Sequence, residues 1–222
     1  MITIKSAQSE NNIEPINSII YDDKYIIPGL NGKEINLDKS FYKMQKLQEF
    51  NSSELVFNYI KPSISLESNK DKIIIRGNKE KNSVSLIFEN VNNLTRYLYQ
   101  KDYRVNVLIN EEDYNLNYEM INNSNLSNTY EKIEKYLNKN KVNKNLCLVK
   151  DNKISTLCKD KYYFKPSLTI SHSNISTNLN KITSGEIILI KDSLTLAELN
   201  LLINQINYKD LKIVPLSELI QE

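Results

Sequence analysis

The stretch SGEIILIKD (residues 184–192) carries the clearest strand signal in the chain and decides the fold class. Its apolar run at 187–190 has the length of a buried strand, and Ser184-Gly185 is a turn pair in front of it. Lys191 and Asp192 follow at the point where this strand leaves the sheet. Because α/β folds place their chemistry at the carboxyl ends of strands, the tip at Lys191 is a candidate functional position.

From Gly77 onward, strand-like and helix-like segments alternate. Helical spacing and capping residues mark the helices, including a cap at Asn128 and the capping box formed by Thr195 and Glu198. Alternation of this kind favours an α/β architecture with parallel strands. Strands are predicted at 83–88, 105–110, 146–149, 167–170, 186–190 and 211–216.

The alternating part is too short for a closed eight-fold barrel. It holds roughly 140 residues, whereas a closed barrel typically has ~250. We therefore expect an incomplete (β/α) barrel over residues 79–222. Residues 1–78 are predicted to be a small N-terminal α+β segment of turns, short strands and one helix. Asp38 is the predicted cap of that helix, and Phe41, Met44 and Leu47 are its apolar positions.

Composition and charge exclude several classes of protein. The 29 Lys and Arg residues nearly balance the 27 Asp and Glu residues, so the net charge of +2 does not indicate a nucleic-acid partner. No stretch approaches the ~20 apolar residues of a membrane span. The start, MITIKSAQSENNIEP, lacks the apolar region of a signal peptide. The protein is therefore either cytosolic or exported by a segment upstream of this sequence.

Two cysteines bear on the compartment. Cys147 and Cys158 flank the stretch 148–157, and a two-residue turn at Asn152-Lys153 would place them opposite each other across a hairpin. Opposed residues lie about 4.5–5.5 Å apart, which suits a disulfide. Two half-buried reduced thiols are the alternative, and the sequence leaves both open. A disulfide would favour an oxidising compartment.

The chain contains one histidine, which limits the metal sites and catalytic sites that it could form. His172 is the only histidine, so neither a two-histidine metal site nor an H-E-x-x-H motif can be formed. It lies in TISHSNIST (169–177), a Ser/Thr/Asn-rich stretch that indicates an exposed loop.

The order of the segments resembles that of the polysaccharide deacetylase (NodB-homology) family. VSLIFENV (84–91), a helix and YRVNVLIN (103–110) resemble the family's opening, where a strand ends in T-F-D-D-G. The closing region from GEIILIKD (185–192) through LSELI (216–220) resembles its end, where a strand terminates in Leu-x-His. The stretch 26–66 is similar to the non-catalytic lead segment of exported, membrane-anchored Firmicute members. The resemblance spans most of the chain from about residue 25.

The resemblance implies a degenerate catalytic site. Family members use a divalent metal ion to remove acetyl groups from N-acetylated sugars of chitin-like polymers or peptidoglycan. Carried over by position, Glu89 stands where the family has its catalytic base and Asn90 where it has a metal-binding Asp. The segment 120–132, where two histidines of an H-x-x-x-H motif would ligate the metal, contains none. Lys191 replaces the histidine that acts as general acid.

These replacements predict a pseudoenzyme without metal or other cofactor, since the family's catalysis needs a cation to activate water. Glu89, Asn90 and Lys191 should still lie together at the strand ends, with Glu89 and Lys191 forming an ion pair. The expected role is binding of cell-wall glycan or an envelope protein, outside the cytoplasm, with an anchor that lies outside this chain. The alternatives are an active carbohydrate deacetylase or hydrolase acting on C–N bonds with rearranged residues, and a purely structural envelope domain.

Overall fold

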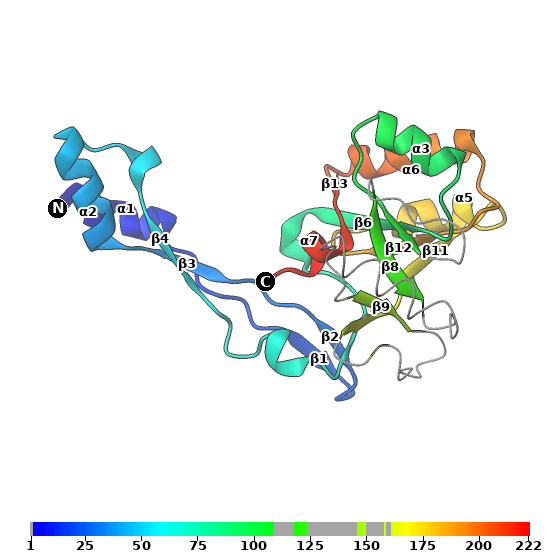
Figure 1. The fold of residues 1–222 in the computed structure, drawn as a ribbon, viewed down its shortest axis with the longest axis horizontal. Coiled ribbons are helices and arrows are strands. Elements are labelled where there is room, and N and C mark those ends of the chain that lie inside the picture. The colour runs from blue at the N-terminus through cyan, green and yellow to red at the C-terminus, as the bar shows by residue number, and fades with distance from the viewer. Residues whose placement is uncertain (1, 109–117, 124–145, 150–157, 159–160) are drawn as a thin grey trace, which may run out of the picture. The chain divides into compact units, whose positions relative to one another are not determined.

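A mainly parallel β-sheet organises the larger part of the chain. The computed structural model describes residues 2–108, 118–123, 146–149, 158 and 161–222 (Figure 1). Within these residues the strands follow the order β1-β2-β5-β10-β9-β8-β7-β6-β12-β11, and β13 also pairs with β6. Every pair from β2 to β11 is parallel, as is the pair of β13 with β6. The bounds are β1 Ile19–Tyr21, β2 Tyr25–Ile27, β5 Ile73–Ile74, β6 Ser83–Phe88, β7 Asn106–Leu108, β8 Glu119–Asn123, β9 Leu146–Leu148, β10 Tyr162–Phe164, β11 Leu168–Ile170, β12 Ile187–Ile190 and β13 Lys212–Ile213.

Helices connect and cover these strands, as parallel pairing requires. They are α3 Asn93–Gln100, α5 Ile175–Asn178, α6 Leu196–Tyr208 and α7 Leu216–Ile220, with short 3-10 turns at Glu67–Asn69, Lys79–Lys81 and Leu179–Lys181. The α3 and α6 helices lie side by side (Figure 1), where the Tyr97 hydroxyl donates to Asn200 Oδ1 at 3.0 Å. The predicted capping box of Thr195 and Glu198 begins α6 as expected. None of the helices in the described residues is long and apolar enough to cross a bilayer.

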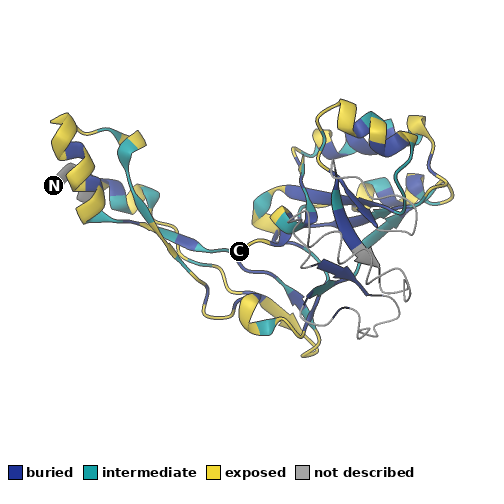
Figure 2. Ribbon diagram, viewed as in Figure 1, coloured by how far each residue is buried: buried dark blue, intermediate teal, exposed yellow. Residues whose placement is uncertain are grey.

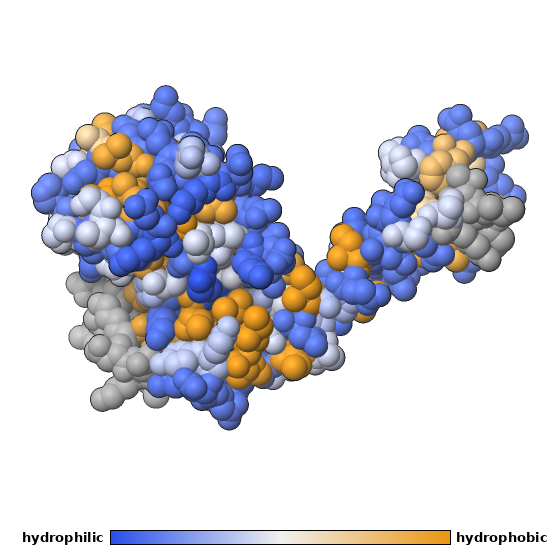
Figure 3. All heavy atoms as spheres, turned by 180° about the vertical axis from the view of Figure 1, so that it is seen from behind, coloured by the Kyte–Doolittle hydropathy of each residue, from blue (hydrophilic) through white to orange (hydrophobic). Residues whose placement is uncertain are grey.

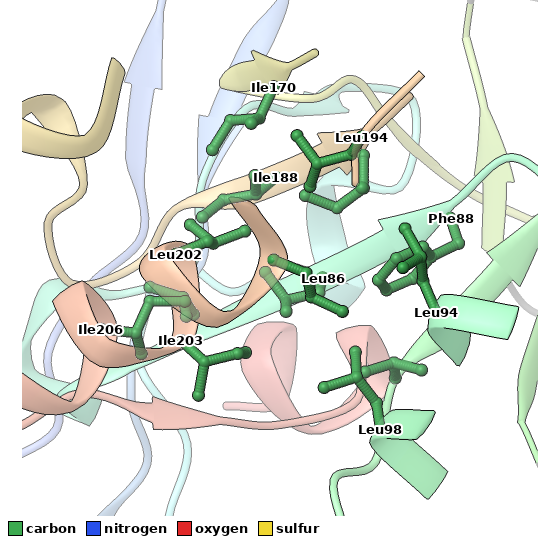
Figure 4. Close-up of a cluster of buried hydrophobic side chains, with 14 of the residues drawn as sticks. Leu86, Phe88, Leu94, Leu98, Ile170, Ile188, Leu194, Leu202, Ile203 and Ile206 are labelled. Atoms are coloured by element: carbon green, nitrogen blue, oxygen red, sulfur yellow. The ribbon is translucent and has the colours of Figure 1, made fainter. Parts of the chain in front are cut away.

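The main core lies between these two helices and the central strands. All six residues of β6 are buried, and Leu86 and Phe88 project toward α3 and α6 (Figure 4). Leu202 and Ile206 of α6 pack on the same cluster. Each such side chain contributes about 1.5–3 kcal/mol by leaving water. The core therefore fixes β6 and β12 in place, and with them the residues that follow these strands.

The chain divides into two compact units at positions other than residue 78. The lead unit comprises Met1–Ile19, Gly29–Ser68 and Glu222; the sheet unit comprises Ile20–Pro28 and Asn69–Gln221. Segments 20–28 and 69–78 belong with the sheet because β2 and β5 pair with each other and β5 pairs with β10. Such long-range pairing leaves no local mark in the sequence.

The lead unit consists of two helices and a two-stranded antiparallel sheet. Its elements are α1 Ile2–Asn11, β3 Gly32–Ile35, α2 Leu37–Leu47, a 3-10 turn at Ser52–Glu54 and β4 Phe57–Ile60. The α2 cap is Asn36, whose Oδ1 accepts from the Lys39 N–H at 2.9 Å, so the prediction that Asp38 caps this helix is wrong. The extended backbone of Asn36 permits the cap, whereas Asp38 already lies inside the helix.

Some predicted elements differ from the structure or lie outside its described part. The closing strand is shorter than predicted, because Pro215 lacks an N–H for strand pairing and instead precedes α7. The strands β1, β8 and β10 were not predicted. The prediction of one helix in residues 1–78 is wrong, because α1 precedes α2 there. The helix expected after Asn128 lies outside the described residues. On the face that Figure 3 shows, apolar residues form patches among mostly hydrophilic ones.

Candidate functional site

The carboxyl ends of β6 and β12 meet because the two strands are adjacent and parallel. Their register pairs Phe88 with Ile190, so the residues that follow, Glu89 and Lys191, emerge side by side. Lys191 Nζ lies 2.5 Å from Glu89 Oε1, and the Asp192 N–H donates to Glu89 Oε2 at 3.4 Å. The side chains of Glu89 and Lys191 are 29% and 41% exposed. An ion pair with this exposure stabilises the fold by only about 0–1 kcal/mol.

Two asparagines extend this contact into a network. Asn90 Nδ2 donates to Asp192 Oδ2, and Asn92 Nδ2 donates to Asp192 Oδ1 at 3.2 Å. Asn92 also begins α3, since its Oδ1 accepts from the N–H groups of Leu94 and Thr95. We call Glu89, Asn90, Asn92, Lys191 and Asp192 the strand-end network. The structure thus brings the three predicted site residues together and adds two more.

The sequence contained partial signals for the added residues. Asn92 directly precedes a helical apolar pattern and is a preferred capping residue, so its place at a helix start could have been inferred. Asp192 directly follows the β12 run, but its hydrogen bonds to Asn90 and Asn92 join positions about a hundred residues apart. Only the pairing of β6 with β12 creates those bonds.

His172 lies on the exposed loop that follows β11, as its sequence context predicted. Its side chain is 68% exposed, and its Nδ1 lies 2.7 Å from Glu198 Oε1. Glu198 is held by the N–H and hydroxyl of Thr195 at 2.9 and 2.8 Å. The pKa of Glu198 is lowered, chiefly by the Thr195 N–H, then by its hydroxyl, with a further contribution from His172. His172 therefore contacts Glu198 at the start of α6 and is not part of the strand-end network.

The strand-end network is a poor set of ligands for a divalent metal ion. Within the described part of the chain, no group of three or more His, Cys, Asp or Glu residues is arranged to hold one. The Lys191 ammonium already pairs with Glu89, and the amide of Asn90 hydrogen-bonds to Asp192. The chain's single imidazole contacts Glu198 instead. These donors do not fit the metal site that the family resemblance implies.

Cys147 and Cys158 form a disulfide in the structure, with Cα atoms 5.8 Å apart and both side chains fully buried. The expected hairpin between them is wrong, because β9 pairs in parallel with β8 on one side and with β10 on the other. Both edges of β9, which carries Cys147, are therefore paired with other strands, and no edge is left for a hairpin partner. The proposed turn at Asn152-Lys153 lies outside the described residues.

Sequence comparison finds one partial relative. No family model matches the chain. The uncharacterized protein YlxY of Bacillus subtilis (strain 168) is 35% identical over 78 residues, which are 35% of this chain. The matched region is about a quarter (24%) of the length of YlxY.

Structural comparison is more extensive. The wild-type protein BA3943 of Bacillus anthracis, described as a CE4 family pseudoenzyme, matches 100% of this chain and 94% of its own with a TM-score of 0.65 at 19% identity. A BA3943 mutant described as having restored enzymatic activity matches equally, with a TM-score of 0.64. The Bc1960 peptidoglycan N-acetylglucosamine deacetylase matches 65% of this chain and 91% of its own at 16% identity, with a TM-score of 0.53.

This protein has the fold of the CE4 polysaccharide deacetylases. The predicted α/β class, a distorted barrel with a smaller N-terminal part, is thereby confirmed. BA3943, described as a CE4 family pseudoenzyme, is one protein with this fold that matches over the full chain.

Proposed function

We propose that this chain is a catalytically inactive polysaccharide deacetylase-like protein of the cell envelope that binds cell-wall glycan. The observation that carries the proposal is the ion pair of Lys191 with Glu89, at the positions where the resemblance puts the general acid and the base. The Glu89 oxygen that contacts the ammonium is already occupied by that hydrogen bond, so it is less available to accept a proton from a water molecule.

The amide at Asn90 adds to this argument. An asparagine offers a neutral oxygen where the family uses a carboxylate, and here its Nδ2 donates to Asp192. Without a bound cation there is no Lewis acid to lower the pKa of the attacking water. The full-length structural match to BA3943, itself described as a pseudoenzyme, supports the same reading.

The compartment is part of the proposal. A buried disulfide between Cys147 and Cys158 supports an extracytoplasmic location, because cytosolic thiols are kept reduced. The resemblance of 26–66 to the lead segment of exported Firmicute members supports an anchor in a part of the protein beyond this chain.

The proposed ligand follows from the chemistry of the strand ends. The amides and carboxylates of the strand-end network can hydrogen-bond to sugar hydroxyl and acetamido groups. Bc1960, which shares the fold, is described as a peptidoglycan N-acetylglucosamine deacetylase. An envelope protein is the other partner that the sequence suggested.

The test combines turnover and binding. Released amines are measured after incubation with N-acetylglucosamine oligomers and Zn²⁺, with an active CE4 deacetylase as positive control; we expect no turnover. Turnover that disappears in Glu89→Ala would instead establish the alternative of an active enzyme with rearranged residues.

Binding is measured by co-sedimentation with purified peptidoglycan, with insoluble cellulose for comparison. We expect peptidoglycan to retain the wild type and to retain Asp192→Ala less well. Glu80→Ala is the matched control, because Glu80 is exposed and lies before β6, at the opposite end of that strand from Glu89. Equal retention on both polymers, or none, would contradict glycan binding and leave a protein partner to be sought.

A further inference from the structure

Backbone hydrogen bonds of Lys191 help to position its ammonium group within the strand-end network. The Lys191 N–H donates to the Ile170 carbonyl at 2.9 Å, and the Lys191 carbonyl accepts from the Leu194 N–H at 3.1 Å. Lys191 therefore leaves β12 with its backbone held on both sides. The β6–β12 register then sets Nζ against Glu89 at 2.5 Å. The position of the ammonium results from the fold as well as from side-chain attraction.

The strand-end network contains two carboxylates, and one of them contacts this ammonium. Glu89 offers Oε1 to Lys191 and Oε2 to the Asp192 N–H, while both oxygens of Asp192 accept from asparagine amides. Carboxylate oxygens are the ligands that hard divalent cations such as Mn²⁺ and Mg²⁺ prefer. The network thus contains two carboxylates of the kind that bind such cations, and the Lys191 ammonium lies against one of them.

We propose that Lys191 is a resident cation that replaces a metal ion at the strand ends, and that its charge keeps divalent cations out. This inference rests on the proposed function, because both assume that the wild-type site binds no metal ion. Its physical basis is separate: a fixed unit charge repels a second cation strongly at the ~4 Å separations found within one site. It also neutralises the charge of Glu89, so that this carboxylate attracts a divalent cation less.

The test measures Mn²⁺ binding by electron paramagnetic resonance, in which free and bound Mn²⁺ are distinguished. The variants are Lys191→Met, which removes the charge at similar side-chain length, and Lys191→Arg, which keeps the charge. We expect Lys191→Met to bind one Mn²⁺ at least about tenfold more tightly than the wild type or Lys191→Arg does. Adding Glu89→Gln to Lys191→Met should abolish this gain.

Two results would overturn the proposal. One is a wild type that binds Mn²⁺ as tightly as Lys191→Met. The other is a Lys191→Met variant with the wild-type circular dichroism spectrum and no gain in Mn²⁺ affinity. Neither result depends on turnover or peptidoglycan retention, so failure here is distinguishable from failure of the proposed function.

A second measurement covers the case in which Lys191→Met does not fold. Acetic anhydride labelling followed by mass spectrometry gives the reactivity of the Lys191 amine in the wild type and in Glu89→Gln. We expect labelling to be several-fold faster in Glu89→Gln, because the amine is then no longer held against a carboxylate oxygen and is more accessible to the reagent. Equal rates would mean that Glu89 does not hold the ammonium, and the proposal would fall.

Discussion

The sheet unit and the lead unit are stabilised by different means. In the sheet unit a large apolar cluster lies between β6, β12 and the helices α3 and α6. Among the described residues of the lead unit, the buried apolar cluster consists of Ala7, Ile35 and Met44, and many other residues of this unit are exposed (Figure 2). Polar contacts supplement this small core. The Glu222 carboxylate accepts from the Ser18 hydroxyl at 2.8 Å and from the N–H groups of Gly29 and Leu66 at 3.2 and 2.6 Å.

The two units should therefore be destabilised most by different kinds of substitution. A unit with a large apolar core loses most when a buried side chain is truncated, because a cavity remains. A unit with a small core depends on satisfied hydrogen bonds, because each buried N–H left without a partner costs about 1–3 kcal/mol.

The largest expected effect is in the apolar core of the sheet unit. Leu86→Ala should lower the free energy of unfolding by about 2–5 kcal/mol, since the fully buried side chain leaves a cavity between β6 and the helices. Urea denaturation followed by circular dichroism measures the change. The control is Leu201→Ala on α6, whose side chain is 55% exposed, with an expected change within about 0.5 kcal/mol. Equal losses in the two variants would refute this account of the core.

The next effect is that of the disulfide. Replacing Cys147 and Cys158 together by serine should cost about 2–4 kcal/mol, because the crosslink restricts the unfolded chain and both positions are buried. The matched comparison is the wild type under reducing conditions, which should lose a similar amount. Thiol titration of the native protein should find no free thiol; two free thiols would count against the disulfide and against the extracytoplasmic location.

A smaller and local effect is expected at Glu222. Glu222→Ala leaves the Leu66 N–H without its carboxylate acceptor, whereas the Gly29 N–H keeps the Ser18 hydroxyl at 2.9 Å. The lead unit should be destabilised by about 1–3 kcal/mol. Hydrogen exchange with mass spectrometry should show faster exchange in the lead unit and unchanged protection of β6. Glu10→Ala, an exposed position in α1, serves as control. Faster exchange throughout the sheet unit would show that the two units do not differ as described.

The smallest effect is a pH dependence at the start of α6. The pKa of Glu198 is below its ordinary value of 4.5, so its carboxylate stabilises the folded state above that value, and the stabilisation is lost as pH falls through the lowered pKa. Glu198→Gln should therefore flatten the fall in unfolding free energy between about pH 5 and 3.

Glu119 gives a comparison of opposite sign. Burial raises its pKa, so its contribution is present at low pH and is lost as pH rises through the raised pKa. As pH rises from acid toward neutral, Glu119→Gln should therefore lose less stability than the wild type does. Identical pH profiles for Glu119→Gln and Glu198→Gln would contradict both assignments.

Much of the fold and site was predictable because the signals are local. The apolar runs of β6 and β12 indicate buried strands by themselves, and the Thr195–Glu198 pair marks the start of α6. Because parallel strands end at one edge of a sheet, residues directly after two such runs were expected to meet, as Glu89 and Lys191 do.

The contacts that join distant segments could not be predicted from the local sequence and are seen only in the tertiary structure. The pairing of β2 and β5 with the sheet, the bonds from Asn90 and Asn92 to Asp192, and the Cys147–Cys158 bond outside any hairpin all depend on which strands become neighbours. A residue's own sequence context encodes its preferred backbone and its burial, but not the identity of a partner a hundred residues away. That identity follows from burying all the apolar faces together, which is a property of the whole chain.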